Sequence, residues 1–146
     1  MDSNKTILIA EDDYAISLAI KTIITKSFDC TLLVAKDGEL AWLAAQENDV
    51  DLIISDWNMP LKTGAQLLED VRSHERLSKI PFLMLTARSD RDSVLDAIDA
   101  GVTEYMHKPF DRKALIERIS SLLELQPIDS IQQDLGLPDD DSLMEG

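Results

Sequence analysis

The stretch Thr6-Ile7-Leu8-Ile9-Ala10-Glu11-Asp12 decides the fold of this 146-residue chain. Its first five residues form an apolar run with β-branched members, which is typical of a strand covered on both faces. Residues 14–27 then place their isoleucines on one helical stripe. This change of period from strand to helix predicts a βα unit, with the acidic pair Glu11-Asp12 in the connecting loop.

The same alternation recurs four more times along the chain. Short apolar runs lie at 31–35, 50–55, 82–85 and 104–107. Helical patterns follow them at about 40–46, 65–74, 90–100 and 112–122. Five βα units in about 125 residues predict a single α/β domain, an open doubly wound parallel sheet of five strands with helices on both faces. A closed eight-stranded barrel would need roughly 200 residues or more.

Two details of the helices are also predicted. In the fourth helix, Val94, Leu95 and Ile98 are spaced to face the core. Ser89 or Asp90 is expected to cap this helix, and Asp111 to cap the last one, because short oxygen-bearing side chains accept hydrogen bonds from the first-turn amides.

Composition excludes several classes of function. The chain has 28 acidic and 14 basic residues, for a net charge of −14. Such a surface repels phosphate backbones, so direct binding to nucleic acid is not expected. No stretch approaches the roughly 20 apolar residues of a membrane span. The lone Cys30 excludes an internal disulfide, fits a reducing cytoplasm and is expected to be a small buried hydrophobe.

Polar side chains stand where four of the apolar runs end: Glu11-Asp12, Asp56, Thr86 and Lys108. The carboxyl ends of parallel strands meet at one edge of a sheet, where open α/β folds place their ligands. Clustered carboxylates need a cation, and an all-oxygen, partly hydrated group suits Mg²⁺. For Glu11 and Asp12 the alternative is a helix N-terminal cap, which is disfavoured once Asp56 joins them.

Asp56 is the candidate nucleophile at this edge. A carboxylate beside Mg²⁺ accepts a phosphoryl group as an acyl phosphate, provided that cations and donors neutralise the phosphoryl oxygens. Lys108 and Thr86 supply an ammonium and a hydroxyl. Taken singly, each is equally well explained as a surface lysine or an ordinary strand-end threonine.

Five motifs together resemble the receiver domain of two-component response regulators over about residues 5–125. They are Ile7-Leu-Ile-Ala-Glu11-Asp12-Asp13, Asp56-Trp-Asn-Met-Pro60, Leu85-Thr86-Ala87, Ala100-Gly101 and Tyr105-Met-His-Lys108-Pro109-Phe110. The resemblance implies a flavodoxin-like sheet with strand order 2-1-3-4-5. It also implies a receiver domain over 1–125 that changes no external metabolite and catalyses only its own phosphorylation and dephosphorylation.

The resemblance assigns a role to each residue of the metal site. Asp56 would take a phosphoryl group from a histidine kinase or a histidine phosphotransfer protein. Asp12 and Asp56 would bind Mg²⁺ directly, Asn58 through its backbone carbonyl and Glu11 through water. The side chains of Asn58 and Arg88 would flank the route of attacking water.

A second group of residues would read the phosphoryl group. Lys108 and Thr86 would hold its oxygens, and the Lys108–Pro109 peptide would be cis. Thr86 and Tyr105 would form a switch that alters the face made by helix 4, strand 5 and helix 5. That face would regulate a downstream protein, an output domain absent from this chain, or a homodimer formed on activation.

Residues 126–146 are expected to form an acidic, mobile tail or linker, because six acids, no base and Pro138 follow Gln126. A docking helix built on Ile128, Ile131 and Leu135 is the less favoured alternative. The sequence leaves open whether this is a stand-alone receiver or part of a longer regulator.

Two other functions remain as alternatives. One is an inert receiver-like interaction module, although such modules typically lack part of the acid, threonine and lysine set. The other is a Mg²⁺-dependent aspartyl-phosphate phosphatase of the dehalogenase type. That class carries its nucleophile after the first strand, usually as Asp-x-Asp, whereas Asp56 follows the third.

Overall fold

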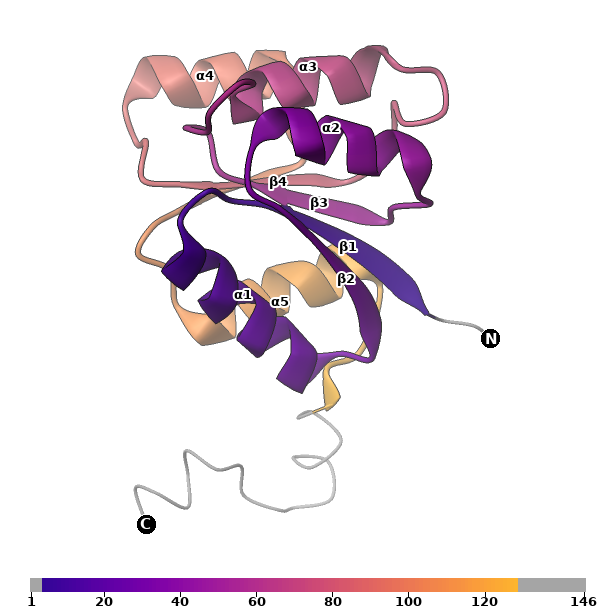
Figure 1. Cartoon of the computed structure of the whole chain (residues 1–146). Helices are drawn as coiled ribbons and strands as arrows, with labels where there is room; N and C mark the ends of the chain where they lie inside the picture. The colour runs from indigo at the N-terminus through magenta and orange to yellow at the C-terminus, as the bar shows by residue number, and fades with distance from the viewer. Residues whose placement is uncertain (1–3, 129–146) are drawn as a thin grey trace.

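The computed structural model describes residues 4–128 (Figure 1). Strands and helices alternate throughout. The strands are β1 (Lys5–Ala10), β2 (Cys30–Ala35), β3 (Leu52–Ser55), β4 (Phe82–Thr86) and β5 (Glu104–His107). The helices are α1 (Tyr14–Ser27), α2 (Gly38–Glu47), α3 (Gly64–Ser73), α4 (Arg91–Asp99) and α5 (Arg112–Leu123).

The five strands form one parallel sheet in the order β2-β1-β3-β4-β5, which confirms the predicted flavodoxin-like topology. Helices α1 and α5 cover one face, and α2, α3 and α4 cover the other (Figure 1). At the carboxyl edge, Ala10 lies opposite Ala35 on one side and Ser55 on the other. The residues that follow β1 and β3 are therefore brought side by side.

The position of β1 in the middle of the sheet explains why the run that forms it is apolar throughout. Ile7 and Ile9 pack into the cluster beneath α1 and α5, whereas Leu8 and Ala10 pack into the cluster beneath α2 and α3. All four side chains are fully buried. A central parallel strand with helices on both faces has no solvent-facing side, so the alternation of polar residues disappears.

Most predicted boundaries hold within one or two residues, and the shifts have local causes. The second helix begins at Gly38, two residues early, because the Asp37 side chain accepts a hydrogen bond from Leu40 N at 2.7 Å. The third strand begins at Leu52, after Asp51 has accepted a hydrogen bond from Thr6 N. Asp90 caps α4, as expected.

Two predictions about helices need correction. Asp111 is the N-cap residue of α5, as expected, but its side chain makes no capping hydrogen bond. In α4 the core face consists of Ser93 and Ala97, while Leu95 and Ile98 are 43% and 57% exposed. Ser93 and Ala97 face inward, and this turns the larger apolar side chains toward solvent.

Arg72 of α3 joins segments that lie far apart in the chain. Its Nε donates to Gly101 O at 2.8 Å, one terminal nitrogen donates to Ser78 O and Ile80 O, and the other donates to Thr103 Oγ1. Burial lowers the pKa of this guanidinium. Arg72 thus ties α3 to the segments that lead into β4 and β5.

Replacing Arg72 should destabilise the fold. The substitution Arg72→Met keeps much of the apolar stem but leaves these acceptors without their donor, at a cost of about 2 kcal/mol in the free energy of unfolding. Urea unfolding monitored by circular dichroism measures the change, with the exposed Lys79→Met as the matched control. Equal unfolding midpoints for the two variants would contradict the role assigned to Arg72.

Three further observations concern the remaining predictions. Cys30 is half-buried at the start of the edge strand β2, not fully buried as expected, because β2 has a neighbouring strand on one side only. Within residues 4–128, no helix has the length and apolar content needed to cross a membrane. The tail predicted for 126–146 lies outside the described residues from 129 onward.

Candidate active site at the carboxyl edge of the sheet

Three carboxylates meet where β1 and β3 end. The Asp56 amide donates to Ala10 O at 3.0 Å and thereby sets the residue after β3 beside the loop after β1. One carboxylate oxygen from each of Glu11, Asp12 and Asp56 lies within 4.8 Å of the others. Glu11 is buried and Asp12 is exposed. This spacing allows the three groups to share one divalent cation, with open positions left for water.

Lys108 enters this group of carboxylates from the end of β5. Its Nζ donates to Glu11 Oε1 at 2.6 Å and to Asp56 Oδ2 at 3.0 Å. Burial by itself lowers the pKa of Lys108, but these hydrogen bonds outweigh it and the pKa is raised. The side chain is therefore an ammonium at neutral pH. The Lys108–Pro109 peptide is cis, as the resemblance implied.

Glu11 is buried, with 3% of its surface exposed. Burial raises the pKa of its carboxyl, and the hydrogen bonds from Lys108 and from Asp13 N offset only part of this effect. The charged form of a buried carboxylate that already pairs with one cation is stabilised further by a second positive charge nearby. The electrostatics of the site thus favour binding of a cation.

Both oxygens of Asp56 are engaged. Oδ1 accepts from Trp57 N at 2.6 Å, and Oδ2 faces Lys108. The backbone of this residue is crowded by Gly64, where an added Cβ would lie 2.0 Å from Asp56 O. Gly64 N also donates to Trp57 O at 2.7 Å. Sequence reasoning missed Gly64 as a positioning residue, because a glycine after the Pro60 loop is equally typical of a simple turn.

Thr86 and Tyr105 lie on either side of the loop after β4. Thr86 is fully buried, and its Oγ1 accepts from Arg88 N at 3.3 Å. The half-buried Tyr105 donates its hydroxyl to Arg88 O at 2.7 Å. Burial, reinforced by Asp90, raises the pKa of this phenol. Among the described residues, no hydrogen bond joins Thr86 to the carboxylates.

Arg88 connects the loop after β3 to the start of α4. Its Nε donates to Asn58 Oδ1 at 3.1 Å, a terminal nitrogen donates to Ser93 Oγ, and its Cζ lies 5.2 Å from the centroid of the Trp57 ring. The two residues expected to flank the route of water are thus in direct contact. That contact joins positions 30 residues apart and could not be predicted from spacing.

The fold and the site define a class of protein: an open α/β domain with a carboxylate cluster and a lysine at the strand ends. The sequence profile of the response regulator receiver domain matches residues 7–120. The chain therefore belongs to the response regulator receiver family.

Individual relatives agree with this assignment. The chemotaxis protein CheY of Pseudomonas aeruginosa is 37% identical over 118 residues, covering 81% of this chain and 95% of that protein. The structure of the chemotaxis response regulator CheY4 of Vibrio cholerae superposes with a TM-score of 0.76 at 27% identity, covering 82% of this chain and 98% of the other. The Mn²⁺-bound response regulator Rcp1 gives a TM-score of 0.70 at 27% identity, covering 81% and 91%.

Proposed function

We propose that this protein is a signalling switch in which Asp56 accepts a phosphoryl group in a Mg²⁺-dependent reaction. The observation that carries the proposal is the position of Asp56, which shares a possible metal site with Glu11 and Asp12 and directs Oδ2 at the Lys108 ammonium. A nucleophilic carboxylate placed between two positive charges is what transfer of an anionic phosphoryl group requires. The proposed donor is the phosphohistidine of a histidine kinase or of a histidine phosphotransfer protein.

The residues present suit a divalent metal ion. Asp12 and Asp56 would contribute carboxylate oxygens, Asn58 its backbone carbonyl, and Glu11 would act through water. Hard oxygen ligands of this kind select Mg²⁺ or Mn²⁺, and Rcp1, of the same fold, has a Mn²⁺-bound form. When bound, the ion would neutralise charge on the phosphoryl oxygens.

We further propose that Thr86 and Tyr105 carry the signal from Asp56 to the face formed by α4, β5 and α5. The loop after β4 is held on one side by Thr86 Oγ1 and on the other by the Tyr105 hydroxyl, both through Arg88. A movement of Thr86 toward a bound phosphoryl group would therefore shift this loop. The exposed Leu95 and Ile98 offer a downstream protein an apolar contact on the same face.

The receiver domain is proposed to extend over residues 1–125.

Among the described residues, none of the contacts at the site favours the phosphatase alternative. An interaction module without chemistry would not need Lys108 between two carboxylates, because burying those charges costs free energy.

Metal binding and phosphorylation of the complete chain test this function together. Addition of Mg²⁺ should change the fluorescence of Trp57, which adjoins Asp56, and acetyl phosphate with Mg²⁺ should add one phosphoryl group by intact mass. Asp12→Asn should weaken Mg²⁺ binding, while Asp29→Asn, an exposed acid remote from this edge, should not. Absence of Mg²⁺ binding to the unaltered protein would support the inert module instead.

Removing the Arg88 side chain should shorten the lifetime of the phosphorylated form. Arg88→Ala takes away the hydrogen bond to Asn58 and the cation–π contact with Trp57, which uncovers the approach of water to Asp56. A contact of this kind contributes about 1 kcal/mol, or about fivefold in rate. Loss of the phosphoryl group after removal of the donor measures it, with the exposed Arg91→Ala as control. An unchanged lifetime in Arg88→Ala would show that Arg88 does not restrict water.

A further inference from the structure

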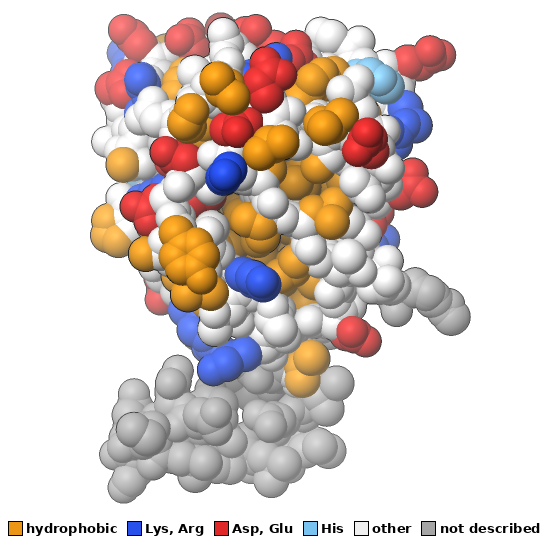
Figure 2. Space-filling model, viewed as in Figure 1, with side chains coloured by type: hydrophobic (Ala, Val, Ile, Leu, Met, Phe, Trp, Pro, Cys, Tyr) orange, Lys and Arg blue, Asp and Glu red, His pale blue; other side chains and the backbone are white. Residues whose placement is uncertain are grey.

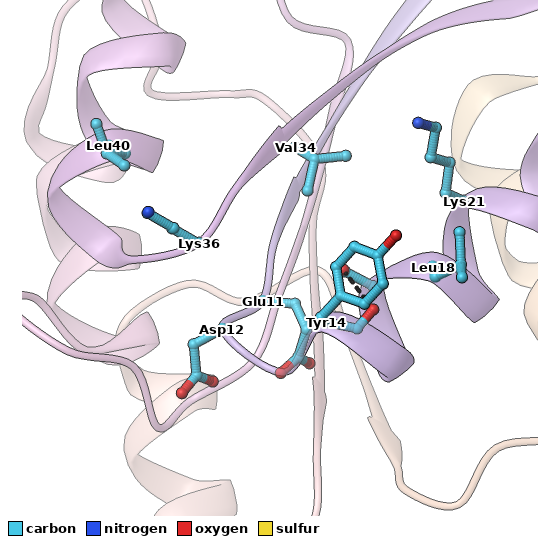
Figure 3. Close-up of a pocket in the computed structure, with 9 residues that line it drawn as sticks. Glu11, Asp12, Tyr14, Leu18, Lys21, Val34, Lys36 and Leu40 are labelled. Carbon is cyan, nitrogen blue, oxygen red and sulfur yellow. Dashed lines mark hydrogen bonds between the residues drawn. The ribbon is translucent and has the colours of Figure 1, made fainter.

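A groove with a volume of about 510 Å³ lies between α1 and α2 and crosses the end of the edge strand β2 (Figure 3). Its apolar lining is unusually exposed: Tyr14 is 77% exposed, Leu18 45%, Val34 48% and Leu40 43%. In Figure 2, hydrophobic side chains gather over this region between the two helices. Contiguous apolar surface of this kind on a small domain marks an interaction site.

The groove also carries two cations. Lys21 projects from α1 and Lys36 follows β2, and the two stand on opposite sides of Val34 (Figure 3). Neither lysine forms an ion pair within residues 4–128. Glu11 and Asp12 also line the groove, at the carboxyl edge where Lys36 follows β2, and Lys21 lies on α1 away from them. The complementary occupant is therefore an apolar segment with acidic residues that reach Lys36 and Lys21.

We propose that residues 129–146 of this same chain dock in the groove. The segment contains six acidic residues and no basic one, together with apolar residues at 131, 135, 137, 143 and 144. Its composition matches the groove in both respects, with apolar side chains for the apolar lining and carboxylates for Lys21 and Lys36. No other part of the chain combines these two properties at a comparable length outside the folded domain.

The segment can reach the groove. The described chain ends at Ile128, just beyond α5, which packs beside α1 on the same face of the sheet (Figure 1). The 14 residues of α1 span about 21 Å. Eighteen residues extend to roughly 60 Å, which leaves ample chain even if part of the segment is compact. Tethering also gives the segment an effective concentration of about millimolar order.

A second copy of the domain is a poorer occupant. In a two-fold symmetric dimer the same surface of two domains would meet, and residues 1–128 of each copy carry 22 acidic and 14 basic residues. Like charges opposed across an interface disfavour association. The chain's own segment is therefore the occupant assigned to the groove, and a dimer is one outcome of the test.

Disulfide trapping in the complete chain tests the docking. In a Cys30→Ser background, Leu18→Cys is combined with Leu135→Cys, and the control combines Ile98→Cys on α4 with the same Leu135→Cys. Ile98 is 57% exposed and lies on the opposite layer. Under mild oxidation at low protein concentration, the groove pair should close at least about tenfold faster than the control pair, because docking raises the local concentration.

The charges supply a second readout. Lys21→Gln with Lys36→Gln should slow closure of the groove pair, and so should high salt, while the control pair keeps its rate. Peptide mass mapping identifies the bridge and shows whether it lies within one chain. Equal rates for the two pairs overturn the proposal. A bridge formed mainly between chains also overturns it and assigns the groove to a second copy.

Discussion

The substitution Asp56→Asn should abolish phosphorylation by acetyl phosphate. The amide is nearly isosteric with the carboxylate but lacks the nucleophilic oxygen pair, and it removes one negative ligand from the possible metal site. It can accept from Trp57 N or from Lys108 Nζ, but a single amide oxygen does not replace the two carboxylate oxygens that serve both donors. Intact mass after incubation with Mg²⁺ and acetyl phosphate measures the loss.

Asp13→Asn is the matched control for this prediction. Asp13 stands at the same edge of the sheet and caps α1 by accepting from Ile16 N at 3.1 Å. Asparagine caps a helix about as well as aspartate, so the control should fold and accept the phosphoryl group normally. A phosphoryl group that persists in Asp56→Asn would remove Asp56 from its proposed role.

The substitution Lys108→Gln should slow phosphorylation by about 10²–10³-fold, the usual effect of losing one preorganised donor to a developing anion. The side chain is only 11% exposed and contacts both Glu11 and Asp56, so neither water nor a neighbouring cation takes its place. The hydrogen bonds that raise the pKa of Lys108 also keep it charged at neutral pH. The initial rate of phosphoryl incorporation measures the effect.

Lys108→Gln should leave Mg²⁺ binding intact or strengthen it. Without the ammonium, no second cation competes for Glu11 and Asp56, so the affinity of these carboxylates for the metal ion is maintained or increased. This separates a defect in phosphoryl transfer from general damage to the site. The exposed Lys79→Gln serves as control and should react at the normal rate. A normal rate in Lys108→Gln would contradict the neutralising role of Lys108.

The sheet and the polar residues at its carboxyl edge were predictable because their signals are local. A buried parallel strand is apolar along its whole length, and the first polar residue after it marks the carboxyl edge. The sequence alone therefore places Asp56 and Lys108 near Glu11. The structure brings these side chains together, while their chemical roles rest on the proposal above.

The outward face of α4 was not predictable in the same way. Its apolar residues form one plausible core stripe, with Leu95 and Ile98, and its small residues Ser93 and Ala97 form another. Hydrophobic spacing favours the first, but the structure buries the second. Which stripe is buried depends on how the helix is rotated about its axis against the domain, and the periodicity of a short helix does not fix that rotation.

Contacts across long separations were also missed. Arg72 reaches Gly101 across 29 residues, and Arg88 reaches Asn58 across 30. The need for Gly64 arises only because its α-carbon approaches the backbone of Asp56. None of these relations leaves a periodic signal in one sequence.

The position of the phosphoryl group along the chain is the decisive measurement for the proposed switch. After reaction with acetyl phosphate and Mg²⁺, borohydride reduction converts an aspartyl phosphate into homoserine, and peptide mass spectrometry locates the converted residue. We expect conversion at Asp56 and at no other acid, and none when Mg²⁺ is withheld. Conversion at a different residue, or equal conversion without the metal, would contradict the role of Asp56 as a metal-dependent phosphoacceptor.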